Sequence, residues 1–240
     1  DHLVAGLEYA PGNASRITLE GFYKKYSQYP ISLIDGVSLA NKGGGFEVLG
    51  NEAISSDGKG KSYGLEALYQ QKLSKNFYGV FAYTYFHSQF TTAQGNYLPS
   101  VWDSRHLISF SGGYKLKRNW EISARWRFSG KTPYVPINPN ATLNAYPEVV
   151  LDYSQLGNVK LDPFNLADIR FDKKWNFKRY SFNFYFEIQN FLAQSVPRPD
   201  DYGLDRTEDG LLVLPLNLVK VNTEENNDIP IPSFGFVIDF

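Results

Sequence analysis

Charged side chains recur at every second position in several segments of the sequence, and such rows could dock another domain or guide a polar solute. Within residues 121–127 and 170–174, acidic and basic residues alternate with apolar or small ones, and residue 66 occupies a comparable position. The full set is Glu66, Glu121, Arg125, Arg127, Arg170, Asp172 and Lys174. Fixed charges that line a path can attract a partner or substrate. The alternative is a solvated wall whose charges pair across neighbouring strands.

Aromatic residues in irregular segments form a second candidate site. They are Trp102, Tyr134, Tyr146, Tyr153 and Tyr202. Because recognition residues are concentrated in loops, these side chains could line a vestibule for a ligand. Alternatively, they pack the loops against each other or belong to an aromatic belt at a membrane surface.

An acidic segment, with Asp200, Asp201, Asp205, Glu208 and Asp209, supplies oxygen ligands of the kind that calcium prefers. Their spacing does not fit an EF-hand loop, so a solvated acidic loop is the other interpretation, and no metal site is predicted. The sequence has no cysteine, and its 3 histidines are scattered. No Ser/His/Asp, Cys/His or paired-carboxylate arrangement stands out, so we predict neither an enzyme nor a cofactor. The net charge of -1 also argues against nucleic-acid binding.

Two-residue periodicity predicts the elements that carry these residues. From Ser104 to Lys131, two alternating segments meet at the polar turn Lys117–Asn119, which indicates a β-hairpin. One face carries Trp120, Trp126 and Phe128, while the other face is charged or small. Similar alternation predicts strands over residues 3–9, 16–26, 61–73, 77–90, 169–175 and 180–191, and a closing strand that ends at residue 240. Residues 77–90 have aromatic side chains on both faces, so their orientation stays open, and residues 211–219 are a candidate tenth strand.

The connections between these strands alternate between short and long. Tight turns separate every second pair, whereas residues 27–59, 91–103, 131–166 and 192–228 are longer and rich in Pro, Gly or Asn. Antiparallel neighbours then have their tight turns at one end and their long loops at the other, as in bacterial outer-membrane barrels. The sequence therefore predicts an all-β fold, a transmembrane antiparallel β-barrel. A soluble β-sandwich is the alternative.

Several motifs resemble the C-terminal barrel of TonB-dependent outer-membrane receptors, with the Bacteroidota branch as the best match. The similarity covers about residues 60–240 and rests on the segments 100–106, 112–115, 130–134, 152–154, 168–175, 187–191 and 231–240. It implies that residues 1–240 are the C-terminal part of a single β-barrel domain, with 9–10 strands of a plugged barrel of about 22 strands. In this family Phe240 would be the C-terminal signal that the barrel-assembly machinery reads.

The resemblance also implies a location and a set of partners. They are the lipid bilayer of the bacterial outer membrane, the protein's own plug domain and N-terminal strands, a TonB-type energy-coupling complex, and a surface lipoprotein over the loops. The expected function is active uptake of a scarce nutrient through a plugged, TonB-gated barrel. Two alternatives remain at this stage: a passive porin or small outer-membrane barrel, and a soluble β-sandwich that binds a ligand through loop aromatics.

Overall fold

The computed structural model describes residues 1–42, 49–221 and 228–240, and β-strands dominate them. The strands are β1 (His2–Tyr9), β2 (Ser15–Ser32), β3 (Ile54–Ser74), β4 (Phe77–Thr91), β5 (Tyr97–Pro99), β6 (His106–Lys115), β7 (Trp120–Ser129), β8 (Phe164–Asn176), β9 (Ser181–Gln189), β10 (Asp201–Leu204), β11 (Leu218–Val221) and β12 (Ile231–Asp239). The helical segments are η1 (Leu39–Asn41), η2 (Lys117–Asn119), α1 (Pro139–Ala145) and η3 (Tyr153–Gln155). None of the helices in the described residues is long and apolar enough to cross a membrane.

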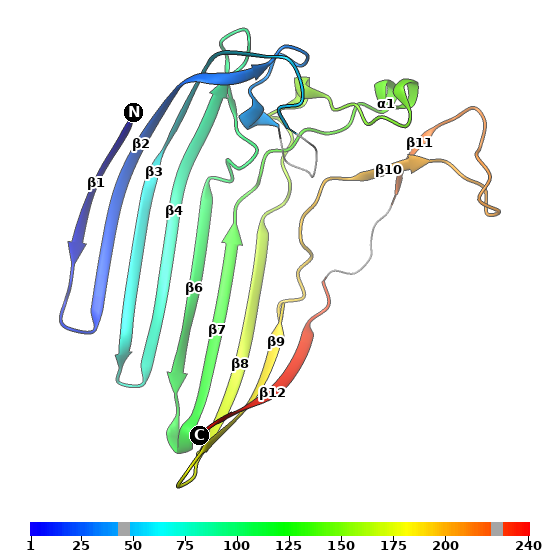
Figure 1. Ribbon diagram of the computed structural model, residues 1–240. Coiled ribbons are helices and arrows are strands. Elements are labelled where there is room, and N and C mark those ends of the chain that lie inside the picture. The colour runs from blue at the N-terminus through cyan, green and yellow to red at the C-terminus, as the bar shows by residue number, and fades with distance from the viewer. Residues whose placement is uncertain (43–48, 222–227) are drawn as a thin grey trace.

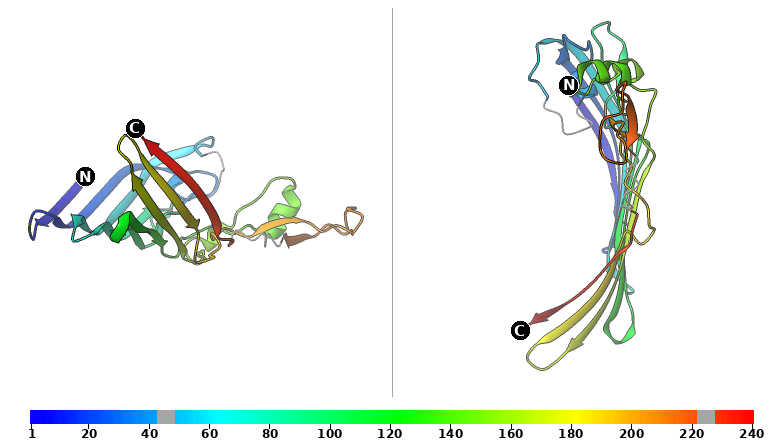
Figure 2. Two further views of the ribbon diagram at one scale, coloured as in Figure 1. Left: turned by 90° about the horizontal axis from the view of Figure 1, so that it is seen from below. Right: turned by 90° about the vertical axis from the view of Figure 1, so that its right-hand side faces the viewer.

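One bowed antiparallel sheet forms most of the molecule (Figures 1 and 2). Its strand order is β1-β2-β3-β4-β6-β7-β8-β9-β12, and the short β5 pairs with β4. Strands that are adjacent in this sheet are also consecutive along the chain, once β5, β10 and β11, which lie in the long connections, are left out. Within the described residues, β1 and β12 each have a partner on one side only. The sheet is therefore an open section of wall with two free edges.

The register places apolar side chains on one face across the whole sheet. A typical row is Leu19, Ala67, Tyr83, Ile108 and Phe128, each paired with the next across β2, β3, β4, β6 and β7. The adjacent row, displaced by one residue along each strand, lies on the opposite face and is mostly polar. It contains Glu20, Glu66, Thr84, Leu107 and Ser129. Because successive side chains in a strand point to opposite faces, the period seen in the sequence becomes an apolar face and a polar face.

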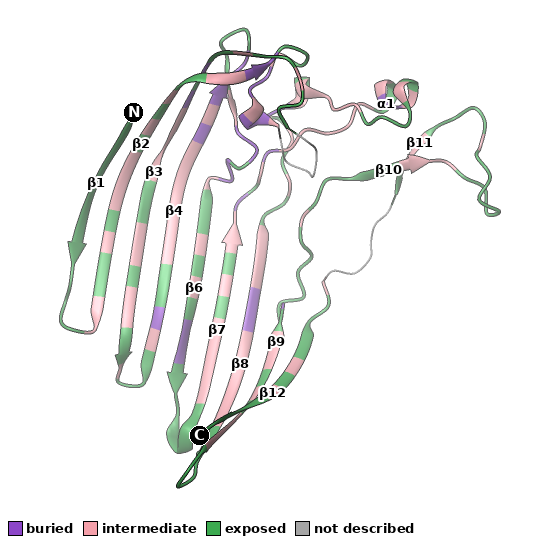
Figure 3. Ribbon diagram, in the orientation of Figure 1, coloured by how far each residue is buried: buried purple, intermediate pink, exposed green. Residues whose placement is uncertain are grey.

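The apolar face of the sheet is exposed. Leu7 and Phe234 are both 77% accessible, and Phe236 is 67% accessible. Buried residues such as Ile31, Asn41 and Phe90 gather instead at the loop end of the sheet (Figure 3). In the described chain the only other sheet is the β10–β11 pair, which does not cover this face. An extended, uncovered apolar face suits contact with lipid, and the soluble-sandwich alternative is wrong.

Tight turns and long loops lie at opposite ends of the sheet, as predicted (Figure 1). In the turn between β3 and β4, Lys75 and Asn76 have φ values of 47° and 76°. Arg118 and Asn119 at the β6–β7 turn are similar, with 60° and 58°. Two consecutive left-handed residues match the twist of a two-stranded ribbon, so these turns are geometrically suited to hairpins.

The structure corrects the predicted boundaries of β2 and β3. Both strands continue into residues 27–59, which the sequence pattern indicated as irregular. The register shifts between Tyr26 and Tyr29 and again between Tyr29 and Ile31, which breaks the two-residue period that a sequence pattern detects. Gly58 is needed in this irregular part, because a Cβ atom there would lie 2.5 Å from the carbonyl oxygen of Tyr29.

Two further points of the prediction are settled by the pairing. In β4, the side chains of Phe81, Tyr83 and Tyr85 belong to the apolar face, since they pair with Phe110, Ile108 and His106 of β6. The predicted bounds of the candidate tenth strand, residues 211–219, are wrong. Only residues 218–221 form a strand, β11, which pairs with β10 in a separate two-stranded sheet rather than joining the main one.

Candidate ligand pocket and charged face

A pocket of about 220 Å³ lies among the long connections at the loop end of the sheet. Four separate connections line it: those after β2, after β5, between β7 and β8, and between β9 and β11. The lining residues include Asn41, Lys42, Val101, Tyr134, Val135, Pro136, Ile137, Leu151, Tyr153, Asp200, Asp201 and Tyr202. Apolar side chains thus form part of the wall, while tyrosine hydroxyls, one amide, one amine and two carboxylates supply the polar groups.

The five predicted loop aromatics divide into two groups. Tyr134, Tyr153 and Tyr202 line the pocket, although they are far apart in the sequence. Trp102 is directed elsewhere: its indole N–H donates to the Ser88 hydroxyl, and its ring meets Phe90 edge to face. Tyr146 is 52% exposed and is absent from the pocket lining. Three of the five residues therefore share one pocket, and their role in ligand binding stays a prediction.

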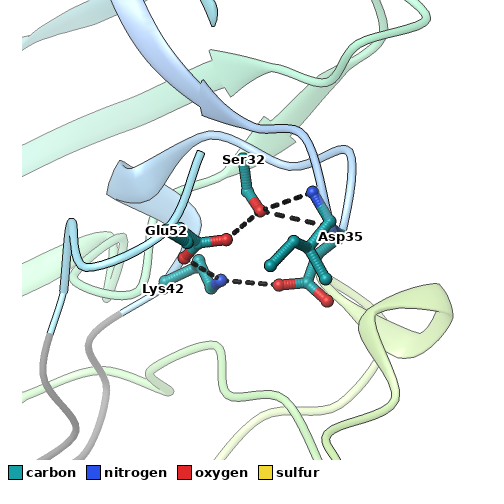
Figure 4. A network of polar contacts seen from close by, with 5 residues as sticks. Ser32, Asp35, Lys42 and Glu52 are labelled. Atoms are coloured by element: carbon teal, nitrogen blue, oxygen red, sulfur yellow. Dashed lines mark hydrogen bonds and ion pairs between the residues drawn. The ribbon is translucent and has the colours of Figure 1, made fainter. Parts of the chain in front are cut away.

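Lys42 is the cationic member of the pocket, and carboxylates hold it in place (Figure 4). Its Nζ atom lies 2.6 Å from Asp35 and 2.5 Å from Glu52, while the Ser32 hydroxyl donates to the other oxygen of Glu52. The same Nζ atom lies 5.4 Å from the ring centroid of Tyr153. These contacts link the beginning and the end of the β2–β3 connection and orient one pocket tyrosine.

This network shifts the pKa values of its charged members. Burial alone would lower the pKa of Lys42, but the hydrogen bonds to Asp35 and Glu52 outweigh that effect and raise it. The hydrogen bonds from Lys42 and Ser32 lower the pKa of Glu52 below its ordinary value of 4.5. At neutral pH Lys42 and Glu52 are therefore both charged, and the contacts of Lys42 with carboxylates leave it locally neutralised rather than free to attract an anion.

The other side of the pocket is acidic. Asp200 pairs with Lys220 at 2.6 Å across the β10–β11 sheet, and Asp201 begins β10. Burial, together with the nearby Asp200 and Tyr202, raises the pKa of Tyr134. The Tyr134 phenol therefore keeps its proton at neutral pH and can donate a hydrogen bond.

The remaining acidic residues of the predicted segment, Asp205, Glu208 and Asp209, do not line the pocket. Among the residues that the structure describes, no group of three or more His, Cys, Asp or Glu side chains converges as a metal site would require. Calcium binding by this segment accordingly has no geometric support.

The seven predicted charged residues all lie on the polar face of the sheet, but only some of them interact. Arg170 makes two hydrogen bonds of 2.8 Å to Asp172, lies 3.9 Å from Glu187, and stacks over the Tyr185 ring at 3.9 Å. Arg125 bridges Asp168 at 3.6 Å and Glu187 at 4.0 Å. This network spans β7, β8 and β9 and resembles the cross-strand ion pairs of a solvated wall.

The other four charged residues take no part in this network, and Glu66 lies on β3, which β4 and β6 separate from it. Glu121 accepts a hydrogen bond from the Tyr78 hydroxyl, and Lys174 lies 3.5 Å from Asp239 of β12. Glu66 is directly opposite Glu20, and neither Glu66 nor Arg127 forms an ion pair within the described part of the chain. Glu121 also has no ion pair among the described residues, but its carboxylate has the Tyr78 hydroxyl as a hydrogen-bond partner, so Glu66 and Arg127 are the members of the set with neither an ion pair nor a hydrogen bond of the side chain in that part of the chain.

Two sets of residues near the site were missed in the sequence. Lys42, Asn41, Asp35 and Glu52 belong to a segment that has no recognisable motif, so no sequence signal indicated them. Asp103 and Arg105 fall within the segment 100–106, one of those on which the family resemblance rests, and in the structure their side chains form an ion pair. The Asp103 carboxylate is buried and lies 3.3 Å from the Arg105 guanidinium, and burial raises its pKa against the opposing effect of Arg105.

Phe240 follows β12 at the tight-turn end of the sheet. Asp239 pairs with Ser181, next to the β8–β9 turn, and the Phe240 ring lies 6.4 Å from that of Tyr180. Its side chain is fully exposed. This position is accessible to an assembly factor on that side, and its role as an assembly signal stays a prediction.

Comparison with solved structures identifies the fold. A ferric-catecholate import receptor, Fiu from E. coli K12, is 11% identical with a TM-score of 0.58, over 99% of this chain and 27% of that one. The ferric citrate transporter FecA is 13% identical with a TM-score of 0.57, over 99% of this chain and 31% of that one. The ferripyoverdine receptor of Pseudomonas aeruginosa is 14% identical with a TM-score of 0.58, over 99% of this chain and 26% of that one. The chain thus spans about a quarter to a third of these structures.

No protein in the curated set matches the sequence. The family described as TonB dependent receptor-like, beta-barrel, matches residues 3–191, which is most of the chain. This agrees with the antiparallel sheet, with its exposed apolar face and with the separation of turns from loops. The chain belongs to the TonB-dependent receptor β-barrel family of the bacterial outer membrane.

Proposed function

We propose that this chain is the C-terminal part of a receptor that imports a scarce nutrient through a plugged, TonB-gated barrel. The loop pocket is the observation that carries the proposal. Four connections, distant in sequence, converge there on three tyrosines and a fixed lysine. A pocket at this end of the sheet would receive a ligand from outside the cell, as expected of a receptor rather than of a general pore.

The two free edges of the sheet support the presence of further strands in the whole protein. In a bilayer, unpaired backbone groups at a sheet edge cannot bond to water, so β1 and β12 require partners in a closed barrel. The polar face of the sheet would then line the lumen. There, Glu66 and Arg127, which lack ion-pair partners in the described chain, are candidates for contact with a plug domain.

The remaining partners follow from the family rather than from this chain. They are a TonB-type energy-coupling complex, the barrel-assembly machinery acting on Phe240, and a surface lipoprotein over the loops, as the Bacteroidota resemblance suggests. The nutrient itself is not specified by the fold, since one barrel architecture serves many cargoes. Because the similar structures include receptors for iron chelates, ferric chelates are the first probes to test.

The first experiment measures uptake of radioactive iron, supplied as ferric catecholate, ferric citrate or ferripyoverdine, by cells that produce the full-length protein. We expect that replacing Tyr134 and Tyr202 together by alanine weakens uptake of the transported chelate about tenfold or more, because hydrogen bonds and apolar contacts at the pocket are lost. Tyr146→Ala is the matched control, since Tyr146 is a loop tyrosine outside the pocket. Equal loss in the control would show that the pocket is not the binding site.

A second experiment separates the receptor from the passive-porin alternative. Active import should stop when an uncoupler abolishes the proton gradient, and the purified full-length protein should show no steady conductance in a planar bilayer. Uptake that continues without the gradient, together with stable open-channel currents, would support the porin instead.

A further inference from the structure

The size and the apolar wall of the loop pocket restrict the group that it can hold. Its volume of about 220 Å³ is below the roughly 300–1,000 Å³ of sites that enclose a whole drug-sized ligand. The lining residues whose side chains carry no polar atom are Val101, Val135, Pro136, Ile137, Leu151 and Pro199. The pocket therefore suits one terminal group of a larger ligand, and that group must itself present an apolar surface.

Among its lining residues the pocket has a single cationic side chain, and that cation is already engaged. The Lys42 Nζ atom lies 2.6 Å from Asp35 and 2.5 Å from Glu52 (Figure 4). An anionic ligand would have to compete with these two carboxylates for the same ammonium group. Two further cations, Lys160 and Arg198, line a separate pocket of about 370 Å³. The first pocket is therefore poorly suited to an anion.

The acidic part of the pocket retains negative charge. Asp200 pairs with Lys220 at 2.6 Å, whereas the Asp201 carboxylate has neither an ion pair nor a hydrogen bond within the described part of the chain. Burial raises the pKa of Tyr134 most, and Asp200 raises it further, by more than Lys220 lowers it. The carboxylates thus outweigh the amine near the Tyr134 hydroxyl, and such a field attracts a cation.

The tyrosine rings of the pocket have faces that a cation can occupy. The negative face of an aromatic ring attracts a cation that lies within about 6 Å of its centroid. Tyr153 already makes such a contact, with the Lys42 Nζ atom at 5.4 Å. Within the part of the chain that the structure describes, no other ring and no cation is stacked on Tyr134 or Tyr202. These two rings are therefore free to contact a cationic ligand.

We propose that the pocket binds an alkylated ammonium group, such as a trimethylammonium group, carried by the imported nutrient. Its methyl groups would contact the apolar wall, while the rings of Tyr134 and Tyr202 and the carboxylates of Asp200 and Asp201 would stabilise its charge. A metal ion lacks the apolar surface that the wall requires, and an anion would meet the carboxylates. This inference rests on the proposed function, because it names the part of the cargo that the pocket receives.

The test compares two ligands of the same shape that differ in charge. Choline carries a trimethylammonium group, and its neutral carbon analogue carries a tert-butyl group in the same place. Isothermal titration calorimetry with the full-length receptor, purified in a mild detergent, would give both affinities. One contact of a cation with an aromatic ring changes affinity about twofold to thirtyfold, so we expect choline to bind about tenfold more tightly than its analogue. Equal affinities, or no saturable binding of choline, would overturn the proposal.

Paired substitutions separate the tyrosine rings from their hydroxyls. Tyr134→Leu with Tyr202→Leu removes both rings and should weaken choline binding about tenfold or more. Tyr134→Phe with Tyr202→Phe keeps both rings and should retain binding within about threefold, which also shows that the loops still fold. Tyr146→Leu is the matched control outside the pocket and should bind choline like the wild type. If the phenylalanine variant loses as much affinity as the leucine variant, hydroxyl hydrogen bonds hold the ligand and the proposal is wrong.

A change of charge gives an independent measurement. Asp201→Asn should weaken choline binding about twofold to fivefold, the effect of an ion pair at an exposed site, and should not change binding of the neutral analogue. Equal changes for the two ligands would contradict a role for charge.

Uptake of the iron chelates distinguishes failure of this inference from failure of the proposed function. If choline does not bind, but Tyr134→Ala with Tyr202→Ala still weakens energy-dependent uptake of a chelate, the pocket receives a different cargo and only this inference is wrong. If neither choline binding nor uptake depends on the two tyrosines, the pocket is not the binding site of a receptor, and both proposals are wrong.

Discussion

Placing a charge at Phe186 tests whether the apolar face contacts lipid. Phe186 of β9 pairs with Phe171 of β8 and with Phe234 of β12, so it lies in a row of three phenylalanines. It is five residues beyond Ser181, the turn-side end of β9. At about 3.3 Å per residue and a tilt of about 40°, this height is roughly 13 Å, near the middle of an apolar band of about 25 Å.

The expected cost follows from this depth. Arginine at the bilayer midplane of an outer-membrane barrel destabilises it by about 2–4 kcal/mol, whereas the cost near the interfaces is about 0–1 kcal/mol. We therefore expect Phe186→Arg in the full-length protein to lose about 2–4 kcal/mol of unfolding free energy. Denaturant unfolding in lipid bilayers, followed by tryptophan fluorescence, would measure it.

Two control variants isolate the cause. Phe186→Leu keeps the site apolar and should change the unfolding free energy by about 1.5 kcal/mol or less. Asn183→Arg introduces the same charge on the polar face of the same strand, where Asn183 now donates to Asp172 at 2.8 Å, and should be tolerated. If Phe186→Arg is as stable as Asn183→Arg, the assignment of the lipid-facing side is wrong.

Two further predictions concern the charged face and the pocket. Replacing Arg170 by methionine should cost about 1–3 kcal/mol of unfolding free energy, because it leaves Asp172 and Glu187 without their shared partner. Arg127→Met is the control and should be nearly neutral; similar losses in the two variants would contradict the network. The β2–β3 connection should open as pH falls, because the pKa of Glu52 is lower in the folded protein than its ordinary value of 4.5. The stabilisation that ionised Glu52 contributes is fully present above pH 4.5. It is lost as pH falls through the lower pKa that Glu52 has in the folded protein. Hydrogen exchange of residues 33–42 between pH 7 and pH 3 would show this opening, and an unchanged pH profile in Glu52→Gln would exclude Glu52 as its cause.

The sequence was sufficient to predict most of the strands of the sheet, because a two-residue period encodes them directly. Rows such as Leu19, Ala67 and Ile108 had to share a face once each strand alternated, and the alternation of short and long connections separated the two ends of the sheet. The two-residue pattern failed to predict strand where the regular pairing between β2 and β3 is interrupted. Near Tyr29 and Ile31 the strands have register shifts, so the period disappears although the strands continue.

The candidate site was only partly predictable. The sequence indicated Tyr134, Tyr153 and Tyr202, because large aromatic residues in loops are uncommon enough to be noticed. It could not separate them from Trp102 and Tyr146, since a local pattern does not record which loops meet in space. Lys42 had no signal at all, because its position depends on Asp35 and Glu52 and on the folding of the connection that contains them.

Outside β4, whose orientation the sequence left open, the sequence by itself determined which side chains of a strand share a face, because alternation along an extended chain is a local property. The tertiary structure alone decided which charges pair and which remain free. Arg125 and Arg127 are equivalent in the sequence pattern, yet only Arg125 reaches Asp168 and Glu187. Lys24 and Lys25 are adjacent residues on opposite faces, and only the register of β2 with β3 pairs Lys25 with Lys61. Such contacts depend on how neighbouring strands are aligned, and no single strand specifies that alignment.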